Sequence, residues 1–147
     1  DSPLAVSGLV KEQGHFAGHD LFSEGAITIQ DESSQLVAPT LDLQGNEQVL
    51  DACAAPGGKT AHMASYLTSG KVTALDLYDH KLDLIQENAE RLGVADQVQT
   101  QKLDARKVHE FLRLAEDEVV QAVTILKISF DGFVPRHIHT WQHHIQS

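Results

Sequence analysis

The sequence contains few of the residues and patterns that are typical of disulfide-bonded, membrane and nucleic-acid-binding proteins. Its single cysteine, Cys53, cannot form an internal disulfide, so we expect a reducing, cytoplasmic setting. No apolar run approaches membrane-spanning length, and we expect no membrane association. The 11 Lys and Arg residues stand against 21 Asp and Glu, a formal charge of −10. Strong binding to nucleic acid depends on cations that neutralise phosphates, so we expect none from this acidic chain alone.

The composition is otherwise that of an ordinary folded domain, with 41% hydrophobic and 22% charged residues. The first residues, Asp1-Ser2-Pro3, include no initiator Met and no signal-peptide pattern, so we expect an excised piece of a longer protein. Scattered glycines without a sustained period predict an irregular segment over 1–24. Regular patterns predict one core domain over 25–130, and 131–147 is a divergent, histidine-rich tail.

The chain is organised around the stretch 49–60. Val49 and Leu50 lead into the acidic Asp51, and a run of small residues follows before a helical pattern opens at Lys59. A strand that feeds a tight glycine turn and then a helix is how nucleotide-like ligands are held, because small residues let backbone amides approach. The candidate binding residues of this turn are Cys53, Ala54, Ala55, Pro56, Gly57, Gly58 and Lys59.

Two ligand classes compete for this turn. The ending Gly58-Lys59-Thr60 imitates the phosphate-binding loop G-x-x-x-x-G-K-[ST], but Cys53 stands where that loop needs its first glycine. Pro56 also removes one backbone amide from the cradle. The turn therefore disfavours ATP or GTP and favours a nucleoside without a phosphate chain.

The stretch 50–60, Leu-Asp-Ala-Cys-Ala-Ala-Pro-Gly-Gly-Lys-Thr, resembles the S-adenosylmethionine signature of the RNA cytosine-C5 methyltransferases. Within that family it is most similar to the ribosomal RNA small subunit methyltransferase B group, also called Sun or Fmu. The upstream phrase 29–37, Ile-Gln-Asp-Glu-Ser-Ser-Gln-Leu-Val, is similar to a second phrase of the group. The likeness runs from about Gly25 to about Glu110. It is specific, because two such phrases at the proper distance are hard to reach by chance.

The resemblance implies a Rossmann-like, S-adenosylmethionine-dependent methyltransferase fold of the α/β class. The hydrophobic periodicity predicts the helices and strands independently of the resemblance. Apolar and β-branched runs predict strands over 26–30, 48–52, 71–77, 97–103 and 119–128. Apolar residues at helical spacing predict helices over 59–67, 79–92 and 105–114, and Asp31 is a candidate N-cap for an earlier one. Beyond about Arg113 the resemblance ends, so we expect the fold to be truncated or altered after its fourth strand.

Three acidic residues follow the apolar runs of the predicted parallel strands. We expect Asp51 to orient the turn by accepting backbone amides, in preference to contacting a ligand. Asp76 is placed to accept from two ribose hydroxyls, a role that the resemblance also implies. Its alternative, a cap for the next helix, is assigned to Asp79. For Asp104 the resemblance implies an adenine contact, shared with Ala105, and a helix cap is equally compatible with the pattern.

The charged residues of the predicted helix 79–92 are assigned to its solvated side, with no chemistry implied; they are Lys81, Asp83, Glu87, Glu90 and Arg91. The histidines near the N-terminus, His15 and His19, are expected to be solvated rather than to form a metal pair. The histidine-rich tail is expected to be frayed and to bind metal only adventitiously, not as a designed site. We therefore predict no metal centre.

The resemblance implies S-adenosyl-L-methionine as the cofactor and a cytosine of 16S rRNA as the methyl acceptor, reached through the full-length protein. Methylation at cytosine C5 needs a cysteine thiolate that adds to C6. Cys53 lies inside the turn as a small packed residue, and the two cysteines that the family uses have no counterpart here. We therefore expect no catalytic residue in this chain, which would bind the cofactor without transferring its methyl group.

Three interpretations of the function stay open. The chain is part of an rRNA cytosine-C5 methyltransferase whose sequence after about residue 113 is a truncation, a frameshift or a genuine ending. Alternatively, it is a short S-adenosylmethionine-binding module without chemistry. The third interpretation is a methyltransferase that acts on another RNA or on a protein.

Overall fold

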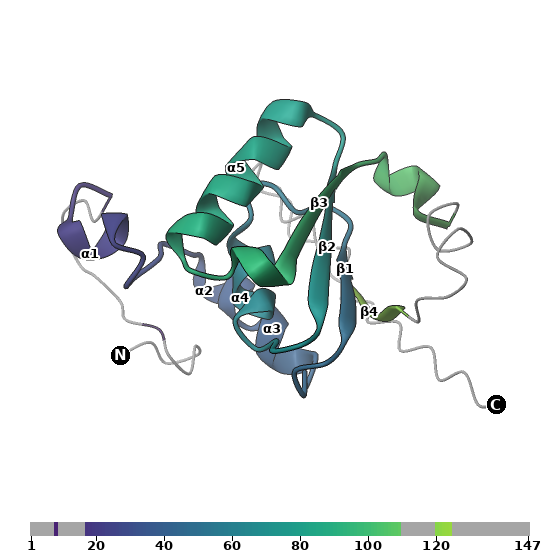
Figure 1. The fold of residues 1–147 in the computed structure, drawn as a ribbon, viewed down its shortest axis with the longest axis horizontal. Coiled ribbons are helices and arrows are strands. Elements are labelled where there is room, and N and C mark those ends of the chain that lie inside the picture. Colours follow the sequence, from purple (N-terminus) through teal and green to yellow (C-terminus); the bar gives the residue numbers. More distant parts are fainter. Residues whose placement is uncertain (1–7, 9–16, 110–119, 125–147) are drawn as a thin grey trace.

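The computed structural model describes residue 8 and residues 17–109 and 120–124. Its centre is a parallel four-stranded sheet in the order β3-β2-β1-β4 (Figure 1). The strands are β1 (Gln48–Asp51), β2 (Lys71–Asp76), β3 (Val98–Lys102) and β4 (Val120–Thr124). The strand order reverses direction at β1, which is the switch point of a Rossmann-like sheet and the place where such folds bind ligands. The predicted fold class is confirmed.

Two connecting helices cover one face of the sheet. α4 (Gly58–Ala64) joins β1 to β2, and α5 (Asp79–Arg91) joins β2 to β3 (Figure 1). Right-handed crossovers between strands added in one direction place both helices on the same face. In the described residues before β1 there are three helices of four residues, namely α1 (Asp20–Ser23), α2 (Glu32–Gln35) and α3 (Val37–Thr40). Two 3₁₀ segments flank β3, namely η1 (Ala95–Gln97) and η2 (Ala105–Lys107).

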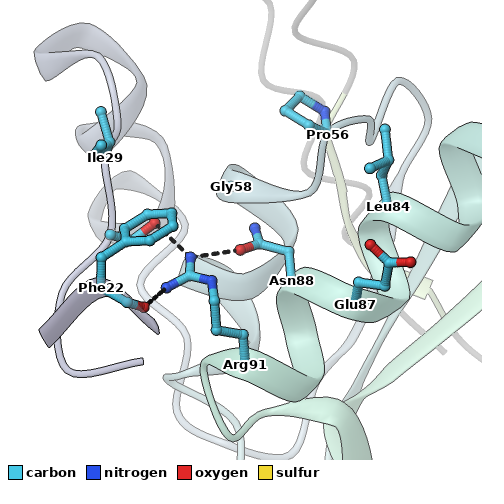
Figure 2. Close-up of a pocket in the computed structure, with 9 residues that line it drawn as sticks. Phe22, Ile29, Pro56, Gly58, Leu84, Glu87, Asn88 and Arg91 are labelled. Atoms are coloured by element: carbon cyan, nitrogen blue, oxygen red, sulfur yellow. Dashed lines mark hydrogen bonds between the residues drawn. The ribbon is translucent and has the colours of Figure 1, made fainter. Parts of the chain in front are cut away.

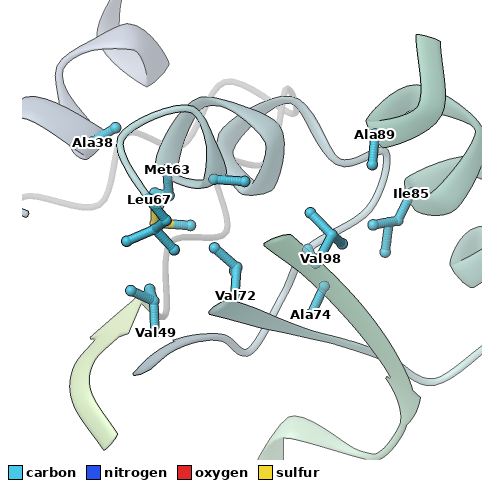
Figure 3. Close-up of a cluster of buried hydrophobic side chains, with 11 residues drawn as sticks. Ala38, Val49, Met63, Leu67, Val72, Ala74, Ile85, Ala89 and Val98 are labelled. Carbon is cyan, nitrogen blue, oxygen red and sulfur yellow. The ribbon is translucent and has the colours of Figure 1, made fainter. Parts of the chain in front are cut away.

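The core lies between the sheet and these two helices (Figure 3). Val49, Val72 and Val98 are register partners on neighbouring strands and belong to one buried cluster. The helices contribute Met63, Ile85 and Ala89, and Leu67 adds to the cluster just after the end of α4. Because successive strand residues alternate between faces, Leu50 and Leu75 point to the opposite side, and both are fully buried as well. Burial on both faces explains why the central strands read as apolar runs.

The predicted strand over 26–30 is wrong. The amides of Ala26 and Ile27 donate to the carbonyl of Leu21 at 2.9 and 3.2 Å. The carbonyl of Ile27 accepts from the side chain of Arg91 at 3.1 Å. These bonds take the place of a strand ladder. A β-branched pattern indicates a fit to a pleated surface, and among the described residues no neighbouring strand supplies that surface here.

Other predicted elements are confirmed with shifted ends. The helix expected over 79–92 is α5, followed by Gly93 at φ 72° as its left-handed C′ residue. The strand expected over 119–128 is confirmed over Val120–Thr124 as β4, paired with β1, and its positions 119 and 125–128 lie outside the described residues. The helix expected over 105–114 begins as η2, and its second half lies outside the described residues, as do positions 1–7, 9–16 and the tail over 131–147. In the described part of the chain, no helix is long and apolar enough to cross a membrane.

Candidate functional site

The carboxyl ends of β1, β2 and β3 meet at one edge of the sheet. Asp51 closes β1 and Asp76 closes β2. Asp76 is the register partner of Lys102, the last residue of β3, and its carbonyl accepts from the amide of Leu103 at 3.0 Å. Asp104 follows directly. Parallel pairing therefore brings the three acidic residues singled out in the sequence to the same edge.

Backbone hydrogen bonds connect the small-residue turn to this edge of the sheet. The amide of Ala54 donates to the carbonyl of Leu75 in β2 at 3.1 Å, and the amide of Gly57 donates to the carbonyl of Ala54 at 2.7 Å. The Ala55–Pro56 peptide bond is cis. The turn thus crosses from the end of β1 toward the end of β2 before α4 begins.

Gly57 is the one turn residue whose backbone requires glycine. Its φ is 103°, a left-handed conformation that other residues rarely adopt. A Cβ at this position would lie 3.0 Å from the Cα of Ile85, in the backbone of α5. The turn therefore packs against α5 with no room for a side chain, which couples its shape to the position of that helix.

The turn residues differ in exposure. Ala54 and Gly57 are buried, Pro56 is exposed, and Cys53, Ala55, Gly58 and Lys59 are half-buried. The half-buried and exposed members leave backbone and side-chain atoms accessible at the edge where the three carboxylates gather. This is the part of the turn that could contact a ligand.

Asp51 has a structural role, as the sequence predicted. Its Oδ1 accepts from the amide of Cys53 at 3.4 Å, and its Oδ2 accepts from the hydroxyl of Thr60 at 2.7 Å. Asp51 is 2% exposed, and this burial raises the pKa of its carboxyl above the usual value, against the opposing effect of the Thr60 hydrogen bond. The Thr60 contact was missed, although a hydroxyl in an otherwise apolar helix face was a usable signal.

Asp76 faces the turn that opens α5. Its Oδ1 accepts from the amides of Leu77 at 2.8 Å and Tyr78 at 3.3 Å. The assignment of the helix cap to Asp79 is wrong: the N-cap position is Tyr78, and Asp79 instead pairs with Lys102 at 2.6 Å. Asp76 is half-buried, and Leu77 beside it is 44% exposed. An acceptor and an apolar surface therefore lie next to each other at the end of β2.

Asp104 caps η2 and is held by one arginine. Its Oδ1 accepts from the amide of Arg106 at 3.0 Å, and both carboxylate oxygens accept from the guanidinium of the same residue. These bonds lower the pKa of Asp104 to about 2, so the group is ionised at any physiological pH. The cap that the sequence allowed is confirmed. A carboxylate offers about four lone-pair sites, so the arginine does not exhaust its capacity as an acceptor.

A pocket of about 440 Å³ lies beside the turn, between α5 and the segment that precedes α2 (Figure 2). Its walls include Phe22, Ile29, Pro56, Leu84 and Arg91. The assignment of Arg91 to the solvated side of α5 is wrong, because its guanidinium bonds to the carbonyls of Phe22 and Ile27. Sequence spacing along α5 carried no signal for this contact, since the partners are more than 60 positions away.

His19 has a local structural role. Its Nδ1 accepts from the amide of Leu21 at 3.2 Å, which caps α1. Among residues 17–109 and 120–124, no group of three or more His, Cys, Asp or Glu side chains is arranged to hold a metal ion. His15 and the tail histidines lie outside the described residues.

Solved structures confirm the fold. NSun6 from Pyrococcus horikoshii, crystallised with SFG, is 32% identical with a TM-score of 0.63, over 67% of this chain and 26% of that one. A methyltransferase homologue from the same organism is 31% identical with a TM-score of 0.62, over 69% of this chain and 33% of that one. Both likenesses cover about two thirds of this chain and no more than a third of the solved chain.

Curated relatives are named as ribosomal RNA small subunit methyltransferases. The probable ribosomal RNA small subunit methyltransferase B of Bacillus subtilis (strain 168) is 52% identical over 73% of this chain. The ribosomal RNA small subunit methyltransferase B of Proteus mirabilis (strain HI4320) is 46% identical over 48%. The chain spans 24% and 17% of the length of these two relatives.

A family model fits the region that builds the site. The model of the 16S rRNA methyltransferase RsmB/F matches residues 38–123, from α3 through β4. This match and the named relatives confirm the group to which the sequence phrases pointed, and with it S-adenosyl-L-methionine as the cofactor of the family. The chain belongs to the 16S rRNA methyltransferase RsmB/F family.

Proposed function

We propose that this chain is the S-adenosylmethionine-binding part of a 16S rRNA (cytosine-C5)-methyltransferase, with residues 25–130 as the binding core, and that it does not transfer a methyl group by itself. The observation that carries the proposal is the convergence of the glycine turn with Asp76 and Asp104 at the edge of the sheet where the strand order reverses. Ligands of open α/β sheets bind in the crevice at this place.

The residues at this edge fit the chemical parts of S-adenosylmethionine. Asp76 supplies a carboxylate for the ribose hydroxyls, and its Oδ1 already accepts from two amides, which fixes the orientation of the group. The exposed Leu77 next to it supplies apolar surface. Asp104 and Ala105 are assigned to the adenine amine and ring, and the turn residues 53–59 to the methionine end. When bound, the cofactor supplies a methyl group on a sulfonium centre, ready for attack by a nucleophile.

The chain's own residues do not complete the reaction. The sequence holds one cysteine, Cys53, and it lies half-buried in the turn with its amide hydrogen-bonded to Asp51. A nucleophile for cytosine C6 must reach the plane of the target base, whereas this residue is part of the cofactor turn. We therefore place the thiolate chemistry outside this chain.

The RNA partner is also reached through the full-length protein in this proposal. The formal charge of −10 supplies no electrostatic attraction for phosphates, so the remaining parts of the protein must hold the 16S rRNA and present the target cytosine out of its stack. The reaction on ribosomal RNA places the protein in the cytoplasm.

The decisive experiment measures cofactor binding. We expect Asp76→Ala to weaken the affinity for S-adenosylhomocysteine, measured by isothermal titration calorimetry, by roughly 1.5–3 kcal/mol, the value of hydrogen bonds to a charged group. Asp76→Asn keeps an acceptor for the amide of Leu77 and removes the charge, so it separates ligand contact from local folding. Asp79→Ala is the matched control, because Asp79 is exposed and pairs with Lys102. Undiminished affinity in both Asp76 variants would refute the ribose assignment.

The single cysteine also favours a second function, an S-adenosylmethionine-binding module without chemistry. The two proposals share the same site and differ in what surrounds the chain. The nucleotide sequence across and beyond codons 113–147 distinguishes them. A downstream Pro-Cys phrase in a continuous or shifted frame supports the enzyme, and a genuine stop after Ser147 supports the module.

A further inference from the structure

Arg91, at the end of α5, holds a distant segment of the chain with its whole side chain. Its Nη1 donates to the carbonyls of Phe22 at 2.7 Å and Ile27 at 3.1 Å. Its Nη2 donates to Asn88 at 2.8 Å and contacts the hydroxyl of Thr28 at 3.4 Å. The guanidinium also lies 4.0 Å from the centre of the Phe22 ring (Figure 2). Only a planar guanidinium can stack and fork its donors in this way.

The held segment, residues 20–28, has little else to fix it. Its helix α1 contains no buried residue, and Leu21 is 44% exposed. At Gly25, with φ of 77°, an added Cβ would lie 1.8 Å from the carbonyl oxygen of Arg91. The segment therefore touches α5 through backbone and guanidinium rather than through an apolar core. In the described part of the chain, Arg91 is its principal polar anchor.

This segment leads directly to the glycine turn. Two residues after Thr28 comes Gln30, whose Nε2 lies 3.7 Å from the place that a Cβ on Gly58 would take. That Nε2 is buried and has no hydrogen-bond partner in the structure. Asp31 follows; its pKa lies below the usual value, first because the Ser33 hydroxyl donates to it, with a smaller contribution from the charge of Lys59. Gln30 thus lies against the turn at Gly58.

We propose that Arg91 is a positioning residue for the cofactor: it holds residues 20–28 against α5 and thereby holds Gln30 against Gly58. This inference rests on the proposed function of the turn. A segment that is already ordered does not have to be ordered when the ligand binds, so the Arg91 contacts lower the entropic cost of binding. Arg91 itself touches no reacting group.

The experiment uses the 147-residue chain and two independent readouts. We expect Arg91→Gln to speed chymotrypsin cleavage after Phe22, because the segment is released, and to weaken S-adenosylhomocysteine binding by roughly 3- to 30-fold, the usual range for mutations that act through coupling. Arg91→Lys keeps the charge but not the fork, and should recover part of both. Glu87→Gln is the control, since Glu87 is exposed and lines the same pocket.

A third variant keeps the test valid if Arg91→Gln fails to fold. The Cβ that Gly25→Ala adds would clash with the carbonyl oxygen of Arg91 and displace the segment without changing any charge. Unchanged affinity in a variant whose segment is cleaved rapidly, and whose thermal melt by circular dichroism matches that of the wild type, would overturn the positioning role. Slow cleavage after Phe22 in both variants would show that Arg91 does not hold the segment. A wild-type chain that does not bind the ligand at all would instead refute the proposed function.

Discussion

The β1 end and the β3 end of the sheet edge share a sequence pattern but differ in the burial, the partners and the pKa of the aspartate. Each consists of a short strand, an aspartate and a following turn. At the β1 end, Asp51 is 2% exposed and bonded to Thr60. At the β3 end, Asp104 meets Arg106, whose side chain is 87% exposed. Burial raises the pKa of the first carboxyl, and the arginine lowers the pKa of the second to about 2.

The cause of the difference is position in the sheet. β1 has a neighbour on each side and a helix above it, so its terminal acid is enclosed by protein. β3 lies at the edge, and four of its five residues are exposed. Asp51 is therefore part of the scaffold, whereas the Asp104 side chain at the edge strand stays 19% exposed. Asp76, on β2 between them, is half-buried like Asp104.

The largest expected effect is a loss of stability caused by a substitution at Gly57, in the turn that follows β1. Gly57→Ala forces a side chain into the left-handed backbone at φ 103° and toward the Cα of Ile85 at 3.0 Å. We expect a loss of roughly 1–3 kcal/mol of unfolding free energy from the backbone strain, measured by urea denaturation. Gly93→Ala is the control, because its φ of 72° is similar but no atom lies within 4 Å of the added Cβ. Equal losses at the two glycines would show that packing against α5 adds nothing.

The second prediction removes the internal partner of Asp51. Thr60→Val keeps the shape of the side chain and leaves Asp51 Oδ2 without its donor, which should cost about 1–3 kcal/mol of stability. Thr60→Ser retains the hydroxyl and should cost less. A serine variant that is as unstable as the valine variant would assign the effect to the methyl group instead of the hydrogen bond.

The same variant has a pH signature. A carboxyl whose folded pKa lies above its unfolded value favours folding most at low pH, and that contribution is lost as the pH rises through the folded pKa. Because the Thr60 hydroxyl lowers the pKa of Asp51, its removal raises that pKa further. The stability difference between wild type and Thr60→Val should therefore grow as the pH rises from the unfolded value of 3.8 through the folded pKa. A constant difference across this range would contradict the coupling.

The smallest expected effect concerns the β3 end. The pKa of Asp104 is depressed to about 2, so its ion pair contributes stability above the unfolded value of 3.8 and loses it as the pH falls toward 2. Arg106→Ala should return the pKa of Asp104 toward 3.8, as followed by carboxyl NMR titration, with little change in overall stability because the pair is exposed to solvent. A titration midpoint that does not move would show that the backbone cap, not the guanidinium, holds the charge.

Local pattern was enough for the four parallel strands and for the acidic residues at the strand ends. The central strands β1 and β2 are apolar runs, and the position of Asp76 after Leu75 follows from counting along the chain. Long-range contacts were out of reach. The bond from Arg91 to the carbonyl of Phe22 joins residues 69 positions apart, and helix spacing assigned Arg91 to solvent. The strand predicted over 26–30 failed for the same reason, since its β-branched residues meet a guanidinium and not a neighbouring strand.

By itself, the sequence determined the α/β class, the family and the residues from which the cofactor site is proposed, because these depend on periodicity and on a short, specific phrase. Only the tertiary structure decided what each acidic residue does. Burial, hydrogen-bond donors and nearby charges set the properties of a carboxyl, and these come from segments that pack together in space. In the sequence, Asp51 and Asp104 are both an aspartate at the end of a predicted strand. The fold alone makes Asp51 a buried structural residue and Asp104 a partly exposed hydrogen-bond acceptor.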